Sequence, residues 1–184
     1  MSQLEAYYIQ RLVDLVGGKL KRSYIVWQDV FDEGVHIAPD TLVHVWIEKR
    51  NGGWRWKMDQ VTKAGYQTIL SAPWYLETAY TEAWREYYET DLLDWDGSEE
   101  QKRRVLGGGA CMWGEYVDGG NLMNKVWTTT AAVAEKLWSP KEATKEAAKA
   151  ARRFHAQHCR MQVTGIRVGP QDGPGHCPCD FAVY

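Results

Sequence analysis

The amino-acid sequence predicts an α/β fold, half of a (β/α)8 barrel, because one pattern occurs in it four times. Each copy begins as a short apolar or β-branched run, which suits a buried strand, and then reaches a tryptophan. In a barrel of this type the residues that follow the strands form the active-site face. We therefore expect function at four strand ends. The four segments are SYIVWQD at 23–29, TLVHVW at 41–46, QTILSAPWYLE at 67–77 and ACMWGEYVD at 110–118.

The composition argues against several functions. With 184 residues and a net charge of −2, the chain lacks the basic surface that nucleic acid or an anionic membrane would need. It has no apolar run of the roughly 20 residues that a membrane-spanning helix requires. Residues 1–6 are too polar for a signal peptide. Ten tryptophans and ten tyrosines, concentrated at the strand ends, favour a carbohydrate-stacking surface.

Helices are expected between and after the strands. The first has no strand before it, so we expect the chain to be part of a longer barrel. Segments 29–40 and 49–57 are expected to be loops, and the tail from residue 168 to be irregular. The expected helices are 2–16 (N-cap Ser2, stop at Gly17-Gly18), 58–64 (stop at Gly65), 81–90, 98–104 (N-cap Ser98), 128–138 and 141–158. We expect 1–139 to form the half barrel and 140–184 the terminal helix and tail.

The strand alternation places particular side chains on common faces. Ile25 and Trp27 share one face of the first strand, and His44 shares a face of the second strand with Trp46. For His44 we favour a hydrogen-bonded interior histidine over a catalytic or ligand role.

The cysteines favour a disulfide over a metal site. Cys159 and Cys177 lie in a histidine-rich segment, but the segment lacks the paired C-x2-C spacing of zinc ribbons and fingers. We predict a disulfide between Cys159 and Cys177 and no metal or other cofactor. Cys179 then has no disulfide partner in the prediction. Cys111 is expected to be a small buried residue of the fourth strand.

The combination VWQDVF, HVW, ILSAPWYLE and CMWGEYVD, in this order and at these spacings, resembles the C-terminal half of the family 20 glycoside hydrolases. The resemblance is to the lysosomal and secreted β-N-acetylhexosaminidases of that family, and AVAEKLWS at 132–139 and HCRM at 158–161 extend it over nearly the whole chain. It implies that the four strands are strands five to eight of the barrel.

The resemblance also implies a role for each matching residue. Trp27, Trp46 and Trp113 would wall the pocket around the N-acetyl group and the sugar ring, with Trp74 adjoining them. Tyr75 would hold the acetamido carbonyl. Glu115 would accept hydrogen bonds from sugar hydroxyls, as would Glu77, which stands where relatives carry Asp or Asn. The substrate-binding residues implied are Trp27, Trp46, Trp74, Tyr75, Glu77, Trp113 and Glu115.

The chemistry of the family is substrate-assisted: the 2-acetamido oxygen attacks the anomeric carbon while a carboxylic acid protonates the leaving oxygen. That acid belongs to an Asp-Glu pair on the fourth barrel strand, which this sequence lacks. Asp32-Glu33 and Glu99-Glu100 do not follow the required strand. We therefore expect the chain to be inactive alone and to need an N-terminal half as a separate or nicked chain.

Two functions remain open. The first is part of a hexosaminidase that removes terminal N-acetylglucosamine or N-acetylgalactosamine from glycans. Such an enzyme would be lysosomal or secreted and would assemble as a dimer of complete barrels. The second is a non-catalytic structural or carbohydrate-binding subunit of a larger assembly. The pocket residues favour the first function and the missing acid favours the second.

Overall fold

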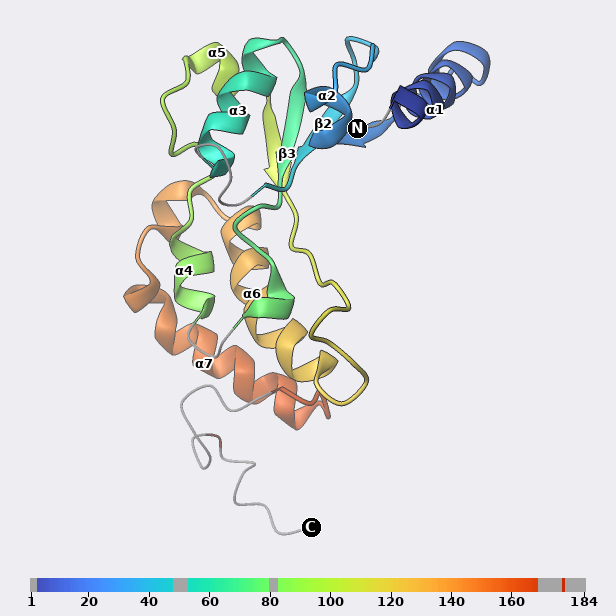
Figure 1. Cartoon of the computed structure of the whole chain (residues 1–184). Helices are drawn as coiled ribbons and strands as arrows, with labels where there is room; N and C mark the ends of the chain where they lie inside the picture. Colours follow the sequence, from blue (N-terminus) through green and yellow to red (C-terminus); the bar gives the residue numbers. More distant parts are fainter. Residues whose placement is uncertain (1–2, 48–52, 80–82, 169–176, 178–184) are drawn as a thin grey trace. The chain divides into compact units, whose positions relative to one another are not determined.

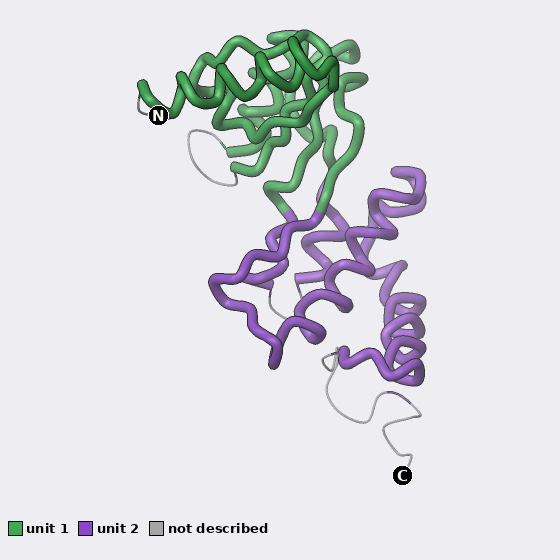
Figure 2. Tube along the Cα trace, turned by 90° about the vertical axis from the view of Figure 1, so that its right-hand side faces the viewer, with its two compact units in different colours: residues 1–73, 92–109 green, residues 74–91, 110–184 purple. Residues whose placement is uncertain are grey.

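The computed structural model describes residues 3–47, 53–79, 83–168 and 177. The chain divides into two compact units, which are described separately (Figure 2). Unit 1 comprises residues 1–73 and 92–109, and unit 2 comprises 74–91 and 110–184. The expectations for Ser2, for the 49–52 part of the glycine-rich loop and for Cys179 lie outside the described residues. No helix in the described ranges is long and apolar enough to cross a membrane.

Unit 1 contains a four-stranded parallel sheet in the order β1-β2-β3-β4. The first three strands are β1 (Ile25–Trp27), β2 (Leu42–Val45) and β3 (Gln67–Leu70), which confirms the expected strands to within a residue or two. The register places Trp27 beside His44 and His44 beside Ile69. Parallel pairing without hairpins is the arrangement that the α/β prediction requires.

The fourth strand was predicted in the wrong place. β4 is Val105–Gly108, and segment 110–118 contributes only an isolated bridge between Cys111 and Tyr75. The strand includes two glycines, which carry no side chain and so leave no alternating pattern to recognise. Gly107 has φ +151°, and the register shifts beside it, between Thr68 and Ile69. Glycine in a strand is typical of such irregular positions.

One face of the sheet is buried against helix α3 (Gly53–Lys63), which lies along β2 and β3 (Figure 1). Val43, Val45 and Leu70 of the sheet belong to the same core cluster as Met58 and Val61 of the helix, and all five are fully buried. The opposite face keeps large apolar side chains in contact with solvent, namely Ile25, Trp27 and Leu106. The sheet therefore has one covered and one open face.

The helices of unit 1 differ from the prediction in three places. Helix α1 (Gln3–Val13) continues as a π-helix, η1 (Asp14–Lys19), through the predicted glycine stop. A Cβ on Gly17 would lie 3.1 Å from the Tyr24 ring, so this glycine makes room for a neighbour. The predicted loop after β1 begins as helix α2 (Gln28–Asp32), and α3 begins five residues before the expected start at Met58.

Two predicted helix signals are confirmed in unit 1. Gly65 follows α3 with φ +98°, the left-handed conformation that glycine adopts readily. Helix α5 (Glu99–Lys102) begins with a capping box, in which the Ser98 hydroxyl accepts from the Gln101 backbone N–H and the Gln101 side chain accepts from the Ser98 N–H.

Unit 2 is helical. Its main helices are α4 (Ala83–Glu89), α6 (Leu122–Trp138) and α7 (Ala147–Val163), with the 3-10 turns η2 (Leu76–Thr78) and η3 (Lys141–Thr144), as Figure 1 shows. α6 starts six residues before the expected Thr128. The expected helix 141–158 is divided into η3 and α7, and Glu89 accepts a hydrogen bond from the Ala147 N–H at the start of α7.

The helices of unit 2 pack through an aromatic core. Trp84 of α4 stacks on Phe154 of α7 with ring centroids 4.3 Å apart, and both are buried. Above this core the Arg153 guanidinium binds Glu135 of α6 at 2.6 Å and donates to the Tyr88 hydroxyl at 2.6 Å. Burial, followed by the charge of Glu135, raises the pKa of Tyr88. One ionic network thus links α4, α6 and α7.

Replacing Phe154 with alanine removes the ring that fills this core and leaves a cavity against Trp84. We expect the free energy of unfolding to fall by about 3–5 kcal/mol, the usual cost of Phe→Ala in a core. Chemical denaturation of the purified chain measures it. Val163→Ala, an exposed position on the same helix, is the matched control and should change the free energy by less than about 0.5 kcal/mol. Equal effects would contradict the assigned core.

Candidate functional site

Trp27 lies at the end of β1 on the open face of the sheet. Its ring stacks on the imidazole of His44, the neighbouring residue on β2, with centroids 4.4 Å apart and planes 20° apart. Trp27 is 42% exposed, so part of its side chain remains accessible to solvent. The adjacent strand thus holds the ring in place from one side.

His44 differs from the expectation of a hydrogen-bonded interior histidine. Within the described residues its Nε2 is buried without a hydrogen-bond partner, and the ring is held by stacking instead. Burial lowers the pKa of His44 from its ordinary 6.5, because removing water disfavours the imidazolium. The structure therefore favours a neutral His44 behind Trp27.

Trp46 follows β2 and is fixed by two residues that the sequence analysis did not single out. The Gln28 side-chain carbonyl accepts from the backbone N–H groups of Trp46 and Ile47, each at 3.0 Å, and Gln28 is almost fully buried. The Asp29 carboxylate accepts from the indole N–H of Trp46 at 2.6 Å. Gln28 and Asp29 directly follow Trp27 in the VWQD segment, and this position is the sequence signal that could have identified them.

In unit 2, Tyr75 lies on irregular backbone that is tied down by its neighbours. The Leu76 N–H donates to the Cys111 carbonyl at 2.8 Å, and the Cys111 N–H donates to the Trp74 carbonyl at 2.9 Å. The hydroxyl of Tyr87 donates to the Tyr75 carbonyl at 2.8 Å. Cys111 is a free thiol that is only half-buried, so its expected burial in a strand was wrong.

Glu77 connects the segment that contains Tyr75 with the segment that contains Trp113 and Glu115. Its side chain is buried, and one carboxylate oxygen accepts from the Trp113 backbone N–H at 3.4 Å. Lys125 of α6 donates to the Glu77 backbone carbonyl at 2.7 Å and to that of Ala79 at 3.4 Å. Trp113 and Glu115 are exposed on the facing segment. Lys125 is a positioning residue that the sequence analysis missed.

Trp74 differs from the other predicted binding residues because it is fully buried. Its indole N–H donates to the Tyr87 carbonyl at 3.1 Å. Trp74 therefore contributes to the interior packing of unit 2, and its place among the expected substrate contacts stays a prediction.

The acidic pairs that were set aside as general acids have structural partners. Asp32 accepts from the buried ammonium group of Lys57 at 2.5 Å, and Glu100 pairs with Arg104 at 2.8 Å.

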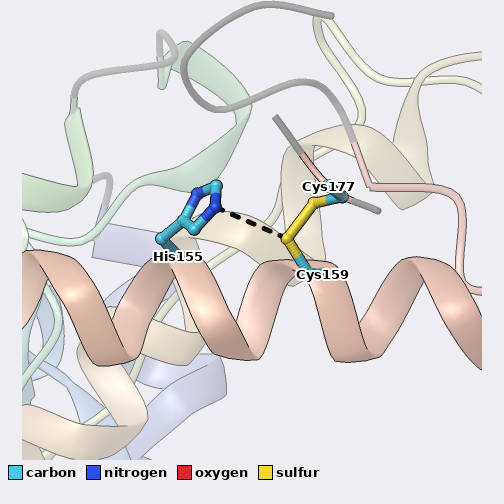
Figure 3. Close-up of a disulfide and its surroundings, with 3 residues drawn as sticks. All are labelled: His155, Cys159 and Cys177. Atoms are coloured by element: carbon cyan, nitrogen blue, oxygen red, sulfur yellow. Dashed lines mark hydrogen bonds between the residues drawn. A yellow bond between two sulfur atoms is a disulfide. The ribbon is translucent and has the colours of Figure 1, made fainter. Parts of the chain in front are cut away.

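The predicted disulfide between Cys159 and Cys177 is present, with Cα atoms 5.4 Å apart. Figure 3 shows the bond beside helix α7, with His155 next to it. It fixes Cys177 to that helix.

The parallel sheet with helices between its strands makes unit 1 an α/β fold, with Trp27 and Trp46 at the strand ends. The catalytic-domain model of glycosyl hydrolase family 20 matches residues 1–141. The chain belongs to this family.

Comparison with individual proteins supports the same family. The chain is 45% identical to β-hexosaminidase subunit beta of Rattus norvegicus, over 91% of this chain and 30% of that protein. It is 41% identical to subunit alpha of Mus musculus, over 98% of this chain and 34% of that protein. A chitobiase of Flavobacterium johnsoniae superimposes with a TM-score of 0.73 at 28% identity, over 89% of this chain and 24% of that one. The chain therefore spans about a third of the length of the curated relatives it matches.

The lowered pKa of His44 predicts a pH-dependent stability. Below pH 6.5 the unfolded histidine binds a proton that the folded one resists, so the free energy of unfolding falls as the pH drops from 6.5 toward the lowered folded pKa. Denaturation of the chain at a series of pH values measures the slope. His44→Gln should flatten it in this window, whereas His36→Gln, at an exposed site, should not. An unchanged slope in His44→Gln would contradict the assignment.

Replacing Lys125 with methionine should loosen the segment that carries Tyr75 and Glu77, because two backbone carbonyls lose their charged donor. We expect faster amide hydrogen exchange at Ala79 and Trp113, measured by NMR. Lys125→Arg should largely retain the slow exchange. Lys149→Met, which removes a surface ammonium group on α7, is the control, and equal changes in both methionine variants would refute a specific role.

Proposed function

We propose that the chain is the C-terminal part, strands five to eight, of the catalytic barrel of a β-N-acetylhexosaminidase. The completed enzyme would remove terminal N-acetylglucosamine or N-acetylgalactosamine residues from glycans. The observation that carries this proposal is the arrangement of Tyr75, Glu77 and Trp113 in a chain that belongs to glycosyl hydrolase family 20. The names of the relatives, β-hexosaminidases and a chitobiase, support the substrate class.

In this proposal the chain supplies the sugar-binding walls. The exposed indoles of Trp27 and Trp113 offer flat apolar surfaces for the C–H face of a pyranose. Tyr75 orients the acetamido group, whose carbonyl oxygen attacks the anomeric carbon with retention of configuration. Trp46 closes the acetamido pocket, and Glu115 and Glu77 accept from sugar hydroxyls. Burial and the bond to Trp113 give Glu77 a fixed position for that contact.

The general acid would come from an N-terminal half of the barrel. Unit 1 has two apolar surfaces that such a partner would cover. One is the open sheet face with Ile25, Trp27 and Leu106. The other is an exposed stripe on helix α1 and the start of η1, which consists of Leu4, Tyr7, Tyr8, Leu12 and Leu15. Exposed apolar areas of this kind are typical of interaction surfaces. The chain alone would be inactive, and complete barrels would pair as dimers.

A lysosomal or secreted location fits this proposal. The Cys159–Cys177 disulfide is stable in an oxidising compartment and is uncommon in the cytosol.

The second candidate is a non-catalytic subunit that binds carbohydrate or stabilises a larger assembly. The sequence contains no Asp-Glu pair at the end of a strand, and Glu77 is one methylene longer than the Asp or Asn expected at that position. Both features favour this alternative.

The native mass of the protein isolated from its source, with every chain in the particle identified, separates the two functions. We expect a one-to-one complex with a chain that carries the Asp-Glu acid motif, and release of the aglycone from an N-acetyl-β-glucosaminide by that complex but not by this chain alone. A particle without such a chain, and without hydrolysis, would exclude the enzyme and leave the binding subunit.

Within the completed enzyme, Trp113→Ala should lower kcat/KM by roughly 10²-fold, because a wall that holds the reacting acetamido group in place is lost. Steady-state kinetics on a chromogenic N-acetyl-β-glucosaminide measure the effect. Trp138→Ala, at a strongly exposed tryptophan outside the proposed pocket, is the control and should leave kcat/KM within about twofold. An unaffected rate in Trp113→Ala would remove Trp113 from the site.

A further inference from the structure

Three side chains with metal-binding atoms lie together beside helix α7, and the proposed function uses none of them. His155 and Cys159 are four residues apart on α7, so they share one face of the helix. Cys177 joins them through its disulfide with Cys159 (Figure 3). The Nε2 atom of His155 lies 3.6 Å from the Cys159 sulfur. The ligand atoms of all three residues lie within 4.8 Å of one another.

We propose that reduction of this disulfide converts His155, Cys159 and Cys177 into a site for a thiolate-preferring divalent cation of the zinc class. Two thiolates and one imidazole are a donor set that Zn²⁺ favours, and water would complete the tetrahedron. Ordinary zinc bond lengths place a sulfur and a nitrogen ligand roughly 3.5 Å apart and two sulfurs roughly 3.8 Å apart. His155 and Cys159 already have nearly this spacing.

The setting supports a defined site. Cys177 is buried, and His155 and Cys159 are half-buried, so a bound cation would be shielded from most of the solvent. Phe154 and Ala150 fix α7 in the core of unit 2. Two of the three ligands, His155 and Cys159, therefore lie on a rigid element, which makes a metal site more precise. The cation would keep Cys177 attached to α7 after the covalent bond is broken.

The chemistry of the conversion is balanced when a phosphine is the reductant. The phosphine transfers two electrons to the disulfide, becomes a phosphine oxide by taking the oxygen of water, and the two protons of that water give two thiols. Zn²⁺ then displaces the thiol protons as it binds. Binding should therefore strengthen as the pH rises.

The test uses the full chain with Cys111 and Cys179 replaced by serine, so that the reduced protein has only two thiols. Co²⁺ serves as the spectroscopic probe and Zn²⁺ as its competitor. After phosphine treatment we expect a sulfur-to-cobalt charge-transfer band that saturates at one equivalent and disappears on addition of Zn²⁺. The oxidised protein should give no such band.

The matched variants identify the nitrogen ligand. His155→Ala and His155→Gln should each weaken Co²⁺ binding by about tenfold or more, since even outer-shell partners of metal ligands contribute 10–100-fold. His36→Ala removes an exposed histidine from unit 1 and should leave the affinity unchanged. Circular dichroism of each reduced variant checks that α7 remains helical.

A second measurement uses the unmodified chain. Zn²⁺ should protect Cys159 and Cys177 of the reduced chain from alkylation by iodoacetamide, while Cys111 reacts at the same rate with and without the ion, as mapped by mass spectrometry. The proposal is overturned by the absence of a band after reduction, by equal binding in the oxidised protein, by unchanged affinity in both His155 variants, or by equal protection of all cysteines. Loss of α7 on reduction that Zn²⁺ does not reverse would overturn it as well.

Discussion

Parallel pairing of four short strands is the constraint on which unit 1 depends. Each strand is only three or four residues long, so it is stable only while helices bury one of its faces. Met58 and Val61 of α3 provide that cover for Val43 and Leu70. The same pairing aligns the strand ends, and this is why Trp27 reaches the ring of His44 on the next strand. Packing and the candidate site therefore follow from one register.

The candidate site in unit 2 has a different basis. Tyr75 and Glu77 lie on irregular backbone, whose polar groups need partners from elsewhere. The Tyr87 hydroxyl, the Cys111 backbone and the Lys125 ammonium provide them, each from a different part of the chain. These three attachments hold Tyr75 and Glu77 in place without a continuous strand.

Helix α7 connects the aromatic core of unit 2 to the disulfide. Its Phe154 packs against Trp84, while Arg153, the residue before it, joins the ionic network with Tyr88 and Glu135. Cys159, on the same helix, is bonded to Cys177. One helix thus contributes apolar, ionic and covalent stabilisation, and the covalent bond attaches Cys177 to it.

The sequence by itself determined the α/β class, three of the four strands, the helix stop at Gly65, the cap at Ser98 and the disulfide, because each of these depends on local periodicity, backbone preference or residue type. Only the tertiary structure decided the position of β4, whose two glycines leave no side-chain pattern. It also decided the burial of Trp74 and the contact between Lys125 and the Glu77 carbonyl, 48 residues apart. Such partners are brought together by packing between distant segments, which no local pattern records.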